Sequence, residues 1–146
     1  MLERIRQKLK KILLLDYSPK RIAMSCALGV FIGFSPYVGL HTGMAMGTSF
    51  VCGLPLYPLL IGAYITNPFT LVPVYTVCYK FGVFVTGKHA SMIPDFDKMD
   101  YTNLMHTAKT FFIPFFVGTH LLGLILGVIT YILSYYLVTK YKSRVK

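Results

Sequence analysis

Hydrophobic positions dominate the sequence in two long blocks that carry no Asp, Glu, Lys or Arg. The first block lies between Arg21 and Lys80 and has 58 residues. The second block, residues 110–139, has 30 residues. Uncharged apolar stretches longer than roughly 18 residues are typical of membrane-spanning segments. The pattern therefore predicts an all-α integral membrane protein.

Proline and glycine divide the first block into shorter pieces. At a rise of about 1.5 Å per residue, one helix of that length would far exceed the ~30 Å hydrocarbon layer. The residue before a proline is pushed out of the helical region, so the sequence predicts helix breaks at Ser35-Pro36 and Asn67-Pro68. The glycine and proline residues between Gly53 and Pro58 indicate a turn between these two breaks.

These breaks predict two Gly/Pro-broken helical hairpins followed by one long helix. The hairpins are residues 22–52 and 56–86, and each forms either one kinked span or a re-entrant pair. Residues 87–109 are expected to form a loop, and residues 110–139 one C-terminal transmembrane helix. We expect residues 17–146 to form a single membrane domain.

Residues 1–16 have the pattern of a basic amphipathic helix. Leu2, Ile5 and Leu9 share one face at helical spacing. Such a helix would lie in the headgroup layer of the membrane, held there by anionic lipid headgroups. The alternative is a solvated basic arm that only sets the topology. The basic membrane-surface residues are Arg4, Lys8, Lys10 and Lys11.

The charge composition supports a membrane protein and argues against a nucleic-acid partner. Charged residues make up 14% of the chain, against about 25% in soluble domains. The net charge is +10, but eleven of the fifteen basic residues lie before Ile22 or after Thr139. A nucleic-acid surface needs positive charge gathered on a folded, solvated face. Under the positive-inside rule, this clustering predicts that both termini are cytoplasmic.

Polar side chains gather at the two proline breaks. Backbone groups freed there are costly against lipid, so they must lie inside protein or line a polar cavity. One interpretation is a binding site where the two breaks meet, as in transporters with interrupted helices. The alternative is that these side chains only form hydrogen bonds with the backbone groups left unpaired at the breaks. The candidate binding residues are Ser35, Pro36, His41, Thr42, Asn67, Pro68 and Thr70.

His41 is the sharpest candidate, because an ionisable side chain inside a membrane often marks a functional site. It follows the break at Pro36, where a restarting helix would point its N–H groups toward an anion. A lipid phosphate would suit this position. The alternative is a neutral buried histidine that is hydrogen-bonded to backbone. His120 is the second histidine in uncharged surroundings.

The sequence offers little catalytic or metal-binding chemistry. Neither apolar block contains a carboxylate, which argues against catalysis by paired carboxylates. Cys26, Cys52 and Cys78 form no C-x-x-C or Cys/His pair that would predict a metal site. We therefore expect no enzyme activity, no cofactor and no metal.

Glycines at helical spacing predict close packing of helices. Small residues four positions apart let two helix backbones approach each other within a bilayer. We expect this packing to lie within one chain, with a homo-oligomer as the alternative. The residues concerned are Gly39, Gly43, Gly47, Gly123 and Gly127.

Two strings at the breaks carry a family resemblance. They are residues 29–36 (Gly-Val-Phe-Ile-Gly-Phe-Ser-Pro) and 39–42 (Gly-Leu-His-Thr), followed by Asn67-Pro68, Pro73 and Tyr75. In these strings the chain resembles a bacterial integral-membrane family catalogued as domain of unknown function 2062. The resemblance implies a small inner-membrane domain, found alone or joined to glycosyltransferase-type domains. It implies no established activity and no known binding residues.

Two functions follow as expectations. In the first, the protein handles or transports a lipid or a lipid-linked phosphate at the two breaks, with membrane lipid as its partner. In the second, it is a non-catalytic scaffold or accessory subunit for a glycosyltransferase or another envelope-biogenesis enzyme. That enzyme would then be its partner in the inner membrane.

Overall fold

A computed structural model describes residues 17–67, 69–87 and 101–145 of the chain. These residues form five α-helices and no strands, which confirms the predicted all-α class. The predicted helix over residues 1–16 lies outside the described residues, and so does Pro68. Most of the predicted loop, residues 88–100, also lies outside them.

Helix α2 (Pro19–Phe34) begins and ends where local chemistry favours it. The Ser18 hydroxyl accepts a hydrogen bond from the backbone N–H of Arg21 at 3.4 Å. Pro19 occupies the first position of the helix, where a missing N–H costs little. At the other end the chain leaves the helix at Ser35, the residue before Pro36.

Three shorter helices follow α2. They are α3 (His41–Cys52), α4 (Leu56–Ala63) and α5 (Leu71–Thr86). Helices α3 and α5 both end at a glycine in the left-handed conformation, Gly53 with φ 61° and Gly87 with φ 64°. A glycine there ends a helix without a steric penalty and lets its own N–H bond a carbonyl of the last turn.

Helix α6 (Tyr101–Val145) has 45 residues and is about 68 Å long. It begins earlier than the sequence predicted, because residues 101–109 are helical and not part of a loop. Within the described residues, Lys109–Ser143 is the one helical stretch that is long and apolar enough to cross a membrane. This stretch contains the predicted transmembrane segment.

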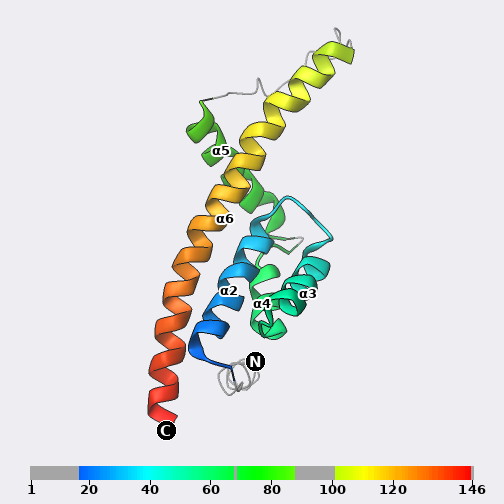
Figure 1. The fold of residues 1–146 in the computed structure, drawn as a ribbon. Helices are drawn as coiled ribbons and strands as arrows, with labels where there is room; N and C mark the ends of the chain where they lie inside the picture. The colour runs from blue at the N-terminus through cyan, green and yellow to red at the C-terminus, as the bar shows by residue number, and fades with distance from the viewer. Residues whose placement is uncertain (1–16, 68, 88–100, 146) are drawn as a thin grey trace.

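Helix α2 packs along the C-terminal half of α6 and runs antiparallel to it (Figure 1). At one end, Nζ of Lys142 donates to the carbonyl oxygen of Tyr17 at 2.7 Å. At the other end, a Cβ at Gly123 would lie 3.0 Å from the Cβ of Phe34. Both ends of the described chain therefore lie at the same end of the molecule.

Helix α5 continues this packing further along α6 and in the same direction as α2. Gly118 of α6 lies against the backbone of Cys78, and Pro114 lies against Gly82 one turn later. Successive positions on α5 thus meet earlier positions on α6. The C-terminal end of α2 faces the N-terminal end of α5, so the two 16-residue helices resemble the halves of one interrupted helix.

Helices α3 and α4 lie between α2 and α5 in the sequence and pack on one side of α2. Helix α4 lies against α2, where a Cβ at Gly62 would be 2.7 Å from the backbone nitrogen of Val30. Helix α3 packs mainly against α4. The predicted hairpins over residues 22–52 and 56–86 are therefore not the packing units. The close approach at Gly62 pairs α4 with α2, and α5 pairs with α6.

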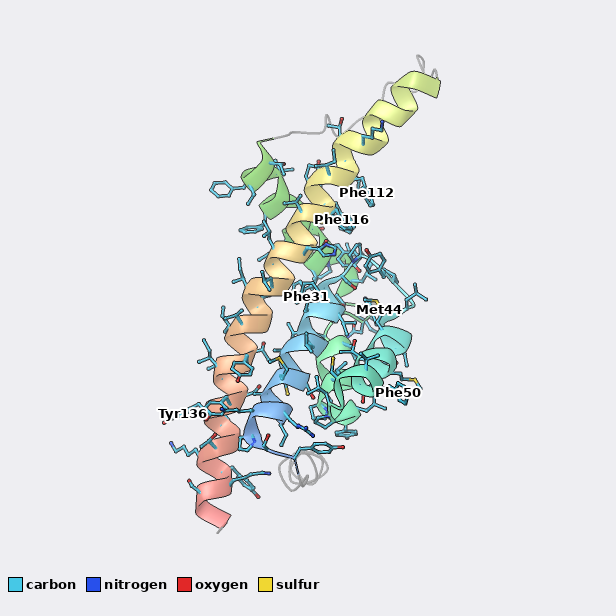
Figure 2. The ribbon with its side chains drawn as sticks, in the orientation of Figure 1. Phe31, Met44, Phe50, Phe112, Phe116 and Tyr136 are labelled. Carbon is cyan, nitrogen blue, oxygen red and sulfur yellow. The ribbon has the colours of Figure 1, made fainter. Side chains whose placement is uncertain are left out.

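The outer surface of this arrangement is apolar. Phe50 of α3 is 91% exposed and points away from the other helices (Figure 2). Phe84 of α5 and Tyr136 of α6 are also exposed. Large exposed apolar surfaces are unusual in soluble monomers, so this surface agrees with the membrane association that α6 suggests.

Candidate functional site

The two proline breaks meet through a hydrogen bond between Thr66 and Gly33. The Thr66 hydroxyl, just after α4, donates to the carbonyl oxygen of Gly33 in the last turn of α2. That carbonyl belongs to the end of a helix, where the usual backbone donor is missing. Thr66 is only 6% exposed, so the bond satisfies a carbonyl that water would reach poorly.

The Ser35 carbonyl oxygen is a second meeting point. It accepts from Nε2 of His41 at 3.3 Å and from the Tyr75 hydroxyl at 2.9 Å. Because a carbonyl oxygen only accepts, His41 carries a hydrogen on Nε2. Three segments thus converge on one oxygen: the end of α2, the start of α3 and the first turns of α5. We call Gly33, Ser35, His41, Thr66 and Tyr75 the polar junction.

His41 in this junction is engaged by the protein itself. It is 8% exposed, and its Nε2–H is used by the Ser35 carbonyl. This geometry matches a histidine that is hydrogen-bonded to backbone, one of the two expectations for the residue. The same N–H is therefore not available to an anion in this arrangement.

Ser35 closes the end of α2. Its hydroxyl donates to the Ile32 carbonyl oxygen at 2.6 Å, and its backbone N–H donates to the same oxygen at 3.0 Å. The side chain is 2% exposed. The Ser35 side chain therefore forms a hydrogen bond with the backbone at the end of the helix. Pro36, half-buried beside it, contributes no N–H donor.

Asn67 and Thr70 hold the turn that precedes α5. Oδ1 of Asn67 accepts from the backbone N–H groups of Phe69 and Thr70 at 2.9 and 3.0 Å. Oγ1 of Thr70 accepts from the backbone N–H of Asn67 at 2.9 Å and donates to the Ile65 carbonyl at 2.9 Å. These bonds satisfy backbone groups of the turn that precedes α5, as Asn and Thr side chains often do outside helices.

Thr42 forms the exposed edge of the site. Its hydroxyl lies 2.8 Å from the hydroxyl of Tyr64, and both side chains are exposed. The pair joins the start of α3 to the end of α4, and so bridges the segment after the first break and the segment before the second. Exposed apolar side chains lie one helical turn away on each side, Met46 after Thr42 and Ile61 before Tyr64.

Sequence reasoning missed both tyrosines of this region. Tyr64 and Tyr75 lie in segments where aromatic residues are frequent, so neither stands out by spacing. Tyr75 does belong to the string that carries the family resemblance, which was the one available signal. Both act through a terminal hydroxyl on a long side chain, a combination suited to bonding polar groups from within an apolar surface.

The predicted packing glycines divide into two groups. Gly123 and Gly127 lie close to α2, where a Cβ at Gly127 would be 3.2 Å from the Ala27 carbonyl oxygen. Gly43 and Gly47 have nothing within 4 Å of a built Cβ, and neither does Gly39, which occupies a turn with φ 88°. The prediction that this second ladder packs within the chain is therefore wrong, because α3 uses its opposite face against α4.

Other glycines make the closest helix contacts, and the prediction omitted them. Gly29, Gly33 and Gly62 let α2 and α4 touch through backbone, and Gly82 and Gly118 do the same for α5 and α6. The four-residue spacing of Gly29 and Gly33 was a usable signal in the sequence. Gly82 and Gly118 are 36 positions apart, so no local spacing reveals them.

Metal ligands do not gather in the part of the chain that the structure describes. No group of three or more His, Cys, Asp or Glu side chains suitable for a metal is found there. The buried side-chain polar atoms of the same residues all have hydrogen-bond partners. The chemistry of the region is therefore hydrogen bonding by hydroxyl, imidazole and backbone groups.

Comparison with known proteins identifies the family. The model of a family described as an uncharacterized protein conserved in bacteria, domain of unknown function 2062, matches residues 2–146. The chain belongs to this family, as the resemblance at its two breaks indicated. Neither the search of curated proteins nor that of solved structures finds a match.

Proposed function

We propose that this member of an uncharacterised bacterial family is a small inner-membrane protein that binds a lipid or lipid-linked phosphate at its joined helix breaks. The carrying observation is the exposed Thr42–Tyr64 hydroxyl pair, at 2.8 Å, on a surface rich in exposed apolar side chains. It lies where the segment after the first break meets the segment before the second. We propose that this pair contacts the lipid headgroup.

The chemistry of the pair suits a phosphate. Two hydroxyl groups carry two hydrogens, and their mutual bond uses one of them. The second hydrogen is left to donate to a phosphate oxygen. In an apolar environment an unmet hydroxyl is costly, so a headgroup oxygen there would offset that cost. Met46 and Ile61 beside the pair would contact the acyl chains.

The arrangement of the helices supports a site within the membrane. The halves α2 and α5 meet beside α6, the helix that is long enough to cross a bilayer. Interrupted helices next to full spans are a common way to place polar groups at depth in a membrane. We also propose that the protein moves the bound lipid across the bilayer.

The topology we propose has both ends of the chain on one side of the membrane. Tyr17 and Lys142 are in contact, and Lys140 lies over the ring of Tyr136 at 5.7 Å in the same region of α6. Basic residues at the end of a span favour the cytoplasmic side and anionic lipid. We place this end of the molecule at the cytoplasmic surface of the inner membrane.

The test is lipid binding and transfer by the purified chain in liposomes. We expect it to bind and move a labelled phospholipid or polyprenyl phosphate. Thr42→Val and Tyr64→Phe should each weaken binding about fivefold, the effect of losing one hydrogen bond. Thr76→Val is the matched control, because the Thr76 hydroxyl is exposed but donates to Val72 within its own helix at 2.8 Å.

Three outcomes of that test decide the proposal. Binding weakened about fivefold in the Thr42 and Tyr64 variants, with the Thr76 variant unchanged, supports it. Equal binding by all three variants overturns the site. Absence of binding by the unmodified chain to any of the tested lipids overturns the function.

The alternative role as a scaffold or accessory subunit stays a prediction. The outer face of α3, with Gly43, Gly47 and Phe50, is open. Lipid would cover that face as well as a partner protein would, so it does not favour an enzyme partner over lipid.

A further inference from the structure

His120 lies among three aromatic rings beside the first helix break. Its ring centroid is 6.0 Å from Phe31, 6.4 Å from Tyr37 and 4.1 Å from Phe116. Phe31 comes from α2, Tyr37 from the segment after the break, and Phe116 from the preceding turn of α6. Figure 2 shows Phe31 near the end of α2 and Phe116 further along α6, beyond that end. The imidazole thus lies beside the first helix break.

One hydrogen bond fixes the tautomer of this histidine. Nδ1 of His120 lies 2.9 Å from the carbonyl oxygen of Phe116. A carbonyl oxygen only accepts, so Nδ1 carries the hydrogen. In the neutral imidazole, Nε2 then presents a lone pair. The Thr119 hydroxyl donates to the same Phe116 carbonyl at 2.9 Å, and its oxygen lies 3.4 Å from Nδ1.

The lone pair on Nε2 is not used within the described part of the protein. The hydrogen bonds of His120 there involve only Nδ1. The His120 side chain is half-buried, and Tyr37, whose ring centroid lies 6.4 Å away, is exposed. His41 differs in this respect, since its Nε2–H is committed to the Ser35 carbonyl.

The Nε2 lone pair and the aromatic rings around His120 determine which chemical group could bind there. A lone pair accepts from a donor, so the complementary group carries an N–H or O–H. Aromatic rings attract cations through their π faces, which favours an ammonium over a hydroxyl. The sequence places no carboxylate between Tyr17 and Pro94 or after Asp100, so a cation here would meet neutral acceptors and rings.

We propose that His120 recognises the primary ammonium of an aminophospholipid, with Nε2 accepting one of its N–H hydrogens beside the three aromatic rings that surround the imidazole. This inference rests on the proposed function and names the headgroup class of the lipid. Tyr37 links the two contacts, because its carbonyl accepts from the backbone N–H of Leu40 at 3.1 Å, two residues before Thr42. The phosphate would lie toward Thr42 and Tyr64, and the ammonium toward His120.

The test compares headgroups that differ in the number of N–H hydrogens. The purified full chain is titrated with phosphatidylethanolamine, its N-monomethyl and N,N-dimethyl forms, phosphatidylcholine and phosphatidylglycerol, and binding is followed by native mass spectrometry. We expect phosphatidylethanolamine to bind about fivefold more tightly than phosphatidylcholine, as one hydrogen bond would provide. His120→Phe keeps a ring but removes the lone pair, and should reduce affinity for phosphatidylethanolamine to that for phosphatidylcholine.

A second measurement needs no variant and so remains decisive if His120→Phe fails to fold. In the ¹⁵N-histidine-labelled chain, phosphatidylethanolamine should shift the Nε2 resonance of His120, and phosphatidylcholine should not. Equal binding of both lipids without that shift overturns the ammonium contact but leaves the lipid-binding function standing. An equal shift with phosphatidylglycerol overturns the choice of ammonium over hydroxyl. Failure to bind any lipid overturns both proposals.

Discussion

The hydroxyl of Tyr75 on α5 donates to the carbonyl oxygen of Ser35 at the end of α2, 2.9 Å away and 40 positions earlier in the chain. This bond joins the two halves of the interrupted helix at the point where its backbone is broken. His41 donates to the same oxygen at 3.3 Å. The break is therefore built as a bonded junction, in which side chains from later segments replace the missing backbone donors.

Tyr75→Phe should lower the stability of the protein, because it removes one donor and keeps the ring that packs on Phe115 at 5.1 Å. We expect a loss of about 1 kcal/mol, since His41 still satisfies the Ser35 carbonyl. Thr66→Val should cost more, about 1–3 kcal/mol, because Thr66 is the side-chain donor to the Gly33 carbonyl in a buried position.

The free energy of unfolding in detergent, measured by denaturant titration, checks both values. Thr86→Val is the matched control, because the Thr86 hydroxyl donates to Gly82 within its own helix at 2.7 Å. A Thr66→Val protein as stable as the control would contradict the role assigned to the junction.

Gly82→Ala and Gly43→Ala should change stability in opposite directions. A Cβ at Gly82 would overlap the backbone of Pro114, so α5 and α6 would have to separate. A Cβ at Gly43 meets nothing within 4 Å, and alanine is the better helix former by roughly 1 kcal/mol. Thermal unfolding should show a lower midpoint for the first variant and a higher one for the second. The reverse order would rule out the packing of α5 on α6 described above.

The contact between Tyr17 and Lys142 predicts that both ends of the described chain lie on one side of the membrane. Single cysteines at Ser18 and Ser143, in a chain whose three native cysteines are replaced, should react with a membrane-impermeant maleimide from the same side. Both positions are exposed, so access is set by the membrane and not by packing. Labelling from opposite sides would refute the antiparallel arrangement of α2 and α6 across the bilayer.

The sequence predicts the helix breaks better than it predicts the helix partners. Ser35-Pro36 and Gly53 act on the chain locally, so their effect on a helix follows from the residues alone. Partner choice depends on contacts such as Gly82 with Gly118, which lie in segments far apart in the chain. The sequence pattern pairs segments that follow one another in the chain as hairpins. In the fold, a backbone contact at Gly62 joins α4 to α2 instead.

In the candidate site, too, the sequence reveals the residues at the breaks but not those that come from distant segments. Ser35, His41 and Thr42 could be selected because polar residues at a break in an apolar block are easily recognised. Asn67 and Thr70 met the same criterion, but their hydrogen bonds hold the turn that precedes α5. Tyr64 and Tyr75 reach the region through long side chains from distant segments, and only the fold brings their hydroxyls there.

Photo-crosslinking tests most directly the claim that a lipid headgroup binds at the joined breaks. The chain is reconstituted with a phospholipid that carries a photoreactive group on its headgroup, and labelled peptides are mapped by mass spectrometry. The account predicts labelling of residues 40–46 and 61–65, around Thr42 and Tyr64, and its loss with excess unlabelled lipid. Labelling spread over the exposed outer faces of α5 and α6, without enrichment at these residues, would contradict it.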